Sequence, residues 1–173
     1  MIFSIVRHIE INEGDQGINL TEFSFMPIGE MGDDKLIKAF LDSDAYRIDS
    51  LRDLVKNNKE NGAYLRRAFD MDKVKIPDFR KTGKGGVSEF LEAFLQEPDW
   101  RTDRDDFEQL LARYSEVNGQ LEETDFYILS KDWFDKDDER LIEPESWVYV
   151  YYFLIISVDA TKGLLTFMEW TYD

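Results

Sequence analysis

Apolar and polar residues alternate with a period of two near the start of the chain. Over residues 2–12 this alternation predicts a β-strand. One side of this strand carries Phe3, Ile5, Ile9 and Ile11, and the other side carries Ser4, His8 and Glu10. The turn-forming run NEGDQG follows, and the β-rich run INLTEFSFMPI ends near Pro27. The first 28 residues therefore predict a β-hairpin.

The middle of the chain changes to a helical period. Residues 32–44 and 46–62 each carry an apolar stripe at spacings of three and four, as do residues 87–98 and 100–119. Ser88 is the expected N-cap of the third helix, and Thr102 with Asp105 has the spacing of a capping box for the fourth. Residues 63–79 are ambiguous between a short helix and an irregular strand, and Pro77 interrupts them.

The last third returns to strands, over residues 124–130, 146–158 and 163–172. The middle one is apolar on both faces, which is typical of a strand at the centre of a covered sheet. We therefore predict an α+β fold in a single domain, residues 1–173. Its antiparallel sheet of four to five strands combines the N-terminal hairpin with a C-terminal meander, and four or so helices pack mainly on one face.

Composition sets limits on the class of protein. A chain of 173 residues with 43% apolar residues can bury a substantial core. It has no cysteine, which excludes disulfides, thiolate metal sites and thiol nucleophiles. Charged residues interrupt the apolar start, and the uncharged run 146–158 is too short to span a bilayer. We expect a cytoplasmic protein without a membrane segment.

The formal net charge of −16 favours a basic partner and disfavours direct binding of nucleic acid. The charge is uneven. Residues 97–145 contain 17 acidic and 6 basic residues, a net of −11, whereas residues 56–86 contain 9 basic and 4 acidic residues, a net of +5. Most of the negative charge therefore lies in the second half of the chain.

Three candidate sites for chemistry are weak. A calcium loop starting at Asp135 would place Arg140 where glycine is required and Ser146 where a bidentate glutamate is required, so it is excluded. The glycine-rich run KTGKGGVSEF is either a plain loop or an anion site at a helix start, because it lacks the P-loop pattern. His8 would need a partner from elsewhere in the fold to act as a base. We predict no cofactor and no metal.

Acidic and aromatic residues occur together in DWFDKDDERLIEPESW, residues 132–147. Negative charge favours rapid, steered association with a basic surface, and large side chains can anchor it. We predict an acidic binding protein that neutralises a basic partner: an immunity-type inhibitor of a toxin enzyme such as a nuclease, or a nucleic-acid mimic. The alternative is an enzyme or small-ligand protein with a cleft beside the central strand. The predicted contacts are Asp132, Trp133, Phe134, Asp135, Asp137, Asp138, Glu139 and Glu143.

Overall fold

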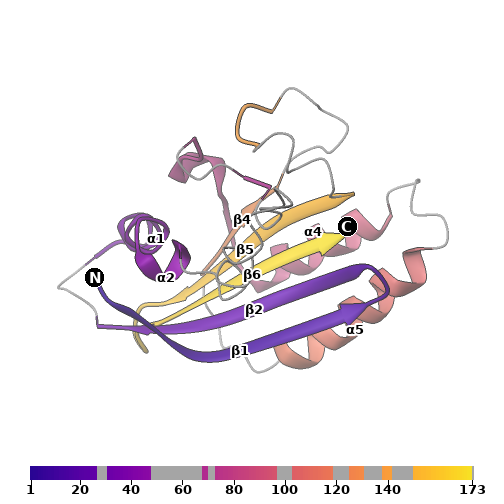
Figure 1. Ribbon diagram of the computed structural model, residues 1–173, viewed down its shortest axis with the longest axis horizontal. Coiled ribbons are helices and arrows are strands. Elements are labelled where there is room, and N and C mark those ends of the chain that lie inside the picture. Colours follow the sequence, from indigo (N-terminus) through magenta and orange to yellow (C-terminus); the bar gives the residue numbers. More distant parts are fainter. Residues whose placement is uncertain are drawn as a thin grey trace, which may run out of the picture.

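A six-stranded antiparallel sheet connects the described parts of the chain (Figure 1). The computed structural model describes residues 1–26, 31–47, 68–69, 73–96, 103–118, 125–130, 138–141 and 150–172. The strand order is β1-β2-β6-β5-β4-β3. The strands are β1 (Phe3–Glu13), β2 (Gln16–Phe25), β3 (Arg80–Thr82), β4 (Asp125–Leu129), β5 (Tyr151–Asp159) and β6 (Leu164–Tyr172).

The predicted N-terminal hairpin is confirmed, with one irregularity. β1 pairs with β2 from Phe3↔Phe25 to Glu13↔Gln16, and the register shifts between Ile5 and Arg7. Val6 is therefore an extra residue, a β-bulge. Because of this bulge, Phe3 packs against one core while Ile9 and Ile11 belong to the other. The prediction that Phe3, Ile5, Ile9 and Ile11 share one face is wrong, since strict alternation cannot account for the bulge.

Strand β5 occupies the interior of the sheet, as its two apolar faces predict. It pairs with β4 on one side and with β6 on the other. Residues Tyr151 to Val158 are all buried. Tyr151, Phe153 and Ile155 face one core, and the residues between them face the other. The turn into β6 contains Gly163 at φ 64°, a conformation that glycine adopts without strain.

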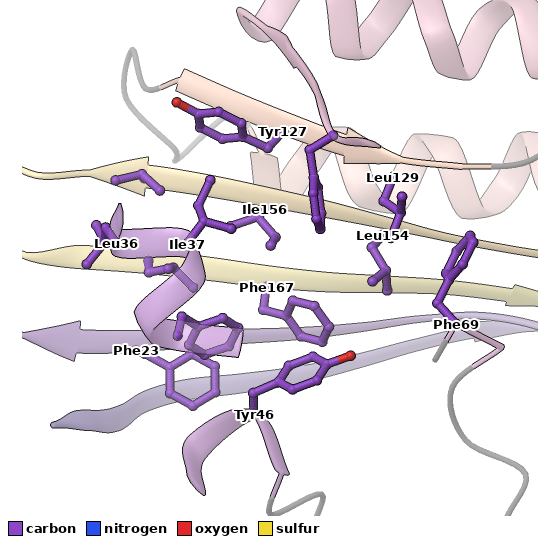
Figure 2. Packing of buried hydrophobic residues seen from close by; sticks show 14 of the residues in the cluster. Phe23, Leu36, Ile37, Tyr46, Phe69, Tyr127, Leu129, Leu154, Ile156 and Phe167 are labelled. Atoms are coloured by element: carbon purple, nitrogen blue, oxygen red, sulfur yellow. The ribbon is translucent and has the colours of Figure 1, made fainter. Parts of the chain in front are cut away.

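One face of the sheet is covered by helices α1 (Asp33–Leu41) and α2 (Asp44–Arg47) and by the 3-10 turn η1 (Ile76–Asp78). Figure 2 shows the core on this face, which combines Ile37 of α1 and Tyr46 of α2 with side chains of the strands, including Phe23 and Phe167. Phe40 of α1 is fully buried and contacts the rings of Phe3, Phe23, Tyr46 and Phe167.

The opposite face is covered by the two longest described helices, α4 (Lys84–Leu95) and α5 (Arg104–Asn118). Val87 and Leu91 of α4 are buried, and so are Phe107, Leu110 and Tyr114 of α5. The predicted apolar stripe of α5 is thus confirmed, with Leu111 half-buried at its margin. These helices pack on aromatic side chains of β5 and β6, where the rings of Phe153 and Trp170 stack at 5.3 Å.

The α+β class is confirmed, and two details of the prediction are corrected. The sheet has six strands instead of four to five, because the three-residue β3 is too short to show alternation in the sequence. The described helices lie on both faces, with the two longest on one of them. Of the predicted helix 46–62, residues 48–62 lie outside the described residues. No described helix is long and apolar enough to cross a membrane.

The start of α4 also differs from the prediction. Gly83 is the N-cap, and Ser88 lies one turn inside the helix, where its hydroxyl donates to the Lys84 carbonyl at 3.5 Å. The run KTGKGG is therefore strand β3 followed by the first turn of α4, and not a loop. Gly86 permits this arrangement, since a Cβ there would lie 1.8 Å from Oγ1 of Thr82.

Candidate functional site

The predicted contact segment is described only in part. Asp138 and Glu139 belong to the described residues, together with Arg140 and Leu141. The other predicted contacts, Asp132, Trp133, Phe134, Asp135, Asp137 and Glu143, lie outside the described residues. The structure therefore bears on this segment only through residues 138–141.

Asp138 and Arg140 form a paired unit against the core. Arg140 donates from Nε to Oδ1 of Asp138 at 2.9 Å and from Nη2 to Oδ2 at 2.7 Å. This bidentate pair raises the pKa of Arg140. The guanidinium also lies 5.6 Å from the centre of the Phe69 ring, and Leu141 forms a β-bridge with Phe69. The Asp138 carboxylate is thus engaged within the fold.

Glu139, next to that pair, is exposed and forms no ion pair with a described residue. It is therefore the described acid of the segment that is open to a partner. Within the described ranges, no three acidic or histidine side chains are grouped so as to hold a metal ion.

A second acidic surface lies on helices α4 and α5. Glu89 and Glu92 of α4 and Asp105 and Glu116 of α5 are exposed, and none of them pairs with a basic side chain of the described chain. We call these four residues the acidic helix layer. The two arginines of α5 are already paired, Arg104 with Glu108 and Arg113 with Glu13. Asp105 and Glu116 belong to the predicted acidic region 97–145, whereas Glu89 and Glu92 precede it in the sequence.

A polar cleft with a volume of about 590 Å³ lies where β4, the β5–β6 turn and the start of α4 meet. Its lining combines three aspartates with Lys84 and two glycines of the α4 start. The residues are Asp33, Gly83, Lys84, Gly85, Asp125, Val158, Asp159, Ala160 and Thr161. The cleft thus adjoins the end of the central strand and contains the glycine-rich run considered as an anion site.

Two of the lining aspartates, Asp33 and Asp125, belong to a charge network beside the polar cleft. Nζ of Lys81 lies 2.7 Å from Asp125 Oδ2 and 3.5 Å from Asp33 Oδ2, and the Tyr127 hydroxyl donates to Asp33 at 2.7 Å. The hydrogen bond to Asp125 raises the pKa of Lys81 above its ordinary value. Burial, followed by the hydrogen bond to Asp33, raises the pKa of Tyr127 to about 12. Both shifts lead away from neutral pH, so these groups suit electrostatic binding better than proton transfer.

His8 does not belong to this cleft. It lies on the edge strand β1, where Nδ1 is 2.8 Å from Oγ1 of Thr21 and Nε2 is 3.2 Å from Oε1 of Glu10. The cleft is formed by β4, β5 and α4, and β2, β6 and β5 separate β1 from β4 in the sheet. His8 therefore contacts Thr21 and Glu10 on the hairpin and is not among the residues that line the cleft.

Sequence reasoning missed both the network and the acidic helix layer, for different reasons. Asp33, Lys81 and Asp125 are far apart in the sequence, and only the pairing of β3 with β4 brings Lys81 beside Tyr127. No local pattern indicates such a contact. The layer was visible as charge on α5, but its combination with α4 depends on how both helices pack on the same face of the sheet.

Comparison with known proteins adds little. No protein-family model and no curated protein matches the chain. A solved structure described as a crystal structure of citrus MAF1 is similar over 94% of this chain and 91% of that one, with 18% sequence identity and a TM-score of 0.39. This likeness is too low to carry a conclusion, so function has to be inferred from the residues of this chain.

Proposed function

We propose that this protein is an acidic binding protein that neutralises a positively charged partner. The observation that carries the proposal is the net charge of −16, together with the exposed carboxylates of α4 and α5 that form no ion pair with a described basic side chain. The form that we favour is an immunity-type inhibitor of a toxin enzyme such as a nuclease. A nucleic-acid mimic acting on a DNA-binding enzyme has the same physical requirements.

The acidic helix layer suits this role because its backbone is held by the core. Leu91 of α4 and Phe107 of α5 are buried against the sheet, while Glu92 and Glu116 are exposed. Charges on a preorganised surface lose little side-chain and backbone freedom on binding. An enzyme site that binds phosphate is positively charged, so such a surface would attract it over several ångströms and speed association.

The predicted segment 132–143 supplies a second contact in this proposal. Among the described residues of this segment, Glu139 is the exposed acidic residue. Arg140 anchors the neighbouring Asp138 to the core at Phe69. The acids Asp132, Asp135 and Asp137 and the aromatic Trp133 would extend the contact.

The test compares two charge reversals of equal size. Glu92→Lys/Glu116→Lys alters the acidic helix layer, and Asp34→Lys/Asp44→Lys alters exposed acids on α1 and α2. Each substitution of an acidic residue by lysine changes the charge by +2, so each pair changes the net charge from −16 to −12. Wild-type protein and both variants are immobilised and exposed to a lysate of the native host, and retained proteins are identified.

We expect a basic protein that is retained by the wild type and by the α1–α2 variant and lost from the α4–α5 variant. That partner, once purified, should lose its enzymatic activity on titration with the wild-type protein. Retention of no basic protein would contradict the proposal. Equal loss from both variants would show that total charge, and not the acidic helix layer, determines binding.

A second candidate function follows from the polar cleft. Its volume of about 590 Å³ lies within the range of small-molecule sites, and charged groups of both signs line it. This cleft supports the alternative hypothesis of a small-ligand-binding protein or enzyme with a cleft beside the central strand. Its polar lining would suit a small zwitterionic or multiply charged ligand, since Lys84 and Asp159 offer opposite charges.

Ligand screening by thermal unfolding separates this alternative from the main proposal. A small polar ligand of the cleft should raise the melting temperature of the wild type, and Asp159→Asn should weaken that effect. The Glu92→Lys/Glu116→Lys variant should bind the ligand normally. If no small zwitterion or polyvalent ion raises the melting temperature, the cleft hypothesis is rejected while the binding-protein proposal stands.

A further inference from the structure

The N-terminal corner of the sheet carries an apolar surface that the proposed function does not yet use. Within the described residues, five large apolar side chains are more than half exposed, and four of them lie at this corner. They are Ile2, Ile5, Val6 and Met26, with exposed fractions of 84, 67, 55 and 85%. The register Phe3↔Phe25 places Ile2 and Met26 at the same end of the hairpin. We call these four residues the apolar corner.

The apolar corner lies along an unpaired strand edge. β1 is the terminal strand of the sheet and pairs only with β2 among the described strands (Figure 1). An exposed edge offers backbone donors and acceptors to another strand, and proteins usually protect such edges with charges or covering elements. The second half of β1 has this protection, because Arg113 of α5 donates to the Asn12 carbonyl at 3.1 Å and pairs with Glu13.

The first half of β1 has apolar side chains where protection is usual. Ile5 and the bulge residue Val6 are exposed, so they contribute little to either core. A strand edge that has no second strand partner among the described residues, beside exposed apolar side chains, is the arrangement that binds extended peptides by strand addition. Backbone pairing would supply affinity, and the apolar corner would supply specificity.

Charge determines which occupant fits. Two copies of this chain would each bring a net charge of −16, which favours the monomer over edge-to-edge pairing. An extended segment of a basic protein is attracted instead. Glu10, with a side chain 54% exposed, lies further along the same strand and would face a basic residue of such a segment.

We propose that the first half of β1 binds an extended segment of the basic partner as an added strand, with apolar residues of that segment on the apolar corner and a lysine or arginine near Glu10. This inference rests on the proposed function, because the charge of the occupant follows from it. It assigns to the partner a further region of contact, separate from the acidic helix layer and from segment 132–143.

The experiment uses a labelled peptide of alternating valine and lysine as the probe, with a control peptide in which alternate backbone amides are methylated. Binding is measured by fluorescence anisotropy at low ionic strength. The variant Ile5→Asp/Val6→Asp adds two negative charges at the edge. The matched control Lys35→Asp changes the net charge by the same −2 at an exposed position of α1.

We expect the valine–lysine peptide to bind the wild type and the Lys35→Asp control with similar affinity. Ile5→Asp/Val6→Asp should weaken binding by about tenfold or more, although its added charge attracts lysine, because apolar burial at the edge is lost. The methylated peptide should bind as weakly to the wild type. Circular dichroism should show that the double variant remains folded.

Each of the following outcomes would overturn the inference. Equal or tighter binding by Ile5→Asp/Val6→Asp, or equal binding of the methylated peptide, would mean that charge alone attracts the probe. A concentration-dependent dimer in sedimentation that Ile5→Asp/Val6→Asp abolishes would make a second copy the occupant. Absence of peptide binding, while polylysine binds the acidic helix layer, would remove the β1 site and leave the proposed function intact. Failure of polylysine to bind as well would reject both.

Discussion

The buried amide of Gln16 connects three parts of the molecule through single hydrogen bonds. Nε2 donates to the Asp103 carbonyl at 2.7 Å, and Oε1 accepts from the Tyr151 hydroxyl at 2.9 Å. Gln16 therefore joins β2 to β5 and to the start of α5. Because it stands in the turn-like run NEGDQG, the sequence indicates nothing of this role.

Removing this amide should destabilise the fold. Gln16→Ala leaves the buried Tyr151 hydroxyl without this partner, which costs roughly 1–3 kcal/mol in the free energy of unfolding. The measurement is urea denaturation followed by circular dichroism. The control Gln109→Ala, at an exposed position of α5, should stay within about 0.5 kcal/mol of the wild type. A Gln16→Ala variant as stable as that control would show that the network contributes nothing.

Tyr127 links stability to alkaline pH. Its pKa of about 12 in the folded protein exceeds the ordinary value of 10.0, so the unfolded chain loses the phenolic proton first. The stabilisation is complete below pH 10 and is lost as the pH rises toward 12. Tyr127→Phe should therefore reduce the steepness with which the free energy of unfolding declines over this range. If the pH dependence of the free energy of unfolding is unchanged in urea titrations between pH 9 and 11, the assignment is contradicted. The other buried tyrosines account for the pH dependence that remains in the variant.

At the scale of elements, the amphipathic patterns predicted most helices and strands, because burial against a core imposes a local period. α5, β2, β4 and β6 agree with their predicted positions within a few residues. The patterns failed where a single residue changed the geometry. The bulge at Val6 and the helix start at Gly83 both depend on contacts that a periodic pattern does not contain.

The bulge in β1 leads to a deletion experiment. Removing Val6 restores a regular ladder in which Phe3 and Ile9 are an odd number of positions apart. Because side chains alternate between the two faces of a strand, Phe3 still faces the α1 core and Ile9 the α5 core. Removing Glu10 instead would place Ile9 and Ile11 on opposite faces of the strand, so one of them would leave the α5 core. We expect the Val6 deletion to change stability by less than about 1 kcal/mol and the Glu10 deletion to cost about 2 kcal/mol or more. Equal losses in urea denaturation would contradict the bulge.

The adjacent glycines of α4 should respond oppositely to alanine. A Cβ at Gly85 meets nothing within 4 Å, so Gly85→Ala should stabilise the protein by about 0.5–1 kcal/mol through helix propensity. At Gly86 the new Cβ would lie 1.8 Å from Oγ1 and 3.0 Å from Cβ of Thr82, so Gly86→Ala should destabilise it by about 1 kcal/mol or more. Thermal unfolding of the two variants provides the comparison. A stabilising Gly86→Ala would place α4 further from β3.

At the scale of the whole molecule, the sequence predicted the class of fold and not its topology. β2 pairs with β6, so residues near the two ends of the chain are neighbours in the sheet. Such long-range pairing leaves no local signal, because any antiparallel pair of these alternating strands would bury similar side chains. The same limit applies to the candidate sites. Charge indicated an acidic region, but only the packing of α4 and α5 on the same face of the sheet shows that exposed carboxylates of both helices cover that face.

The net charge itself should limit stability. With 37 acidic and 21 basic residues, repulsion between carboxylates opposes the compact state more than the extended one. Ion pairs such as Arg104–Glu108 and Lys38–Asp42 are exposed, and each contributes little to stability. Salt that screens all charges should therefore remove less stabilisation from the ion pairs than it removes repulsion from the excess negative charge.

Raising the sodium chloride concentration from about 0.01 M to about 0.5 M shortens the screening length from about 30 Å to a few ångströms. We therefore expect the urea midpoint of unfolding to rise over this range, and to rise less for Glu92→Lys/Glu116→Lys, whose net charge is −12. A midpoint that falls with salt would mean that the ion pairs outweigh the repulsion. Repulsion among the exposed carboxylates would then not limit stability, and the carboxylates proposed for binding would no longer be held at a cost that a basic partner relieves.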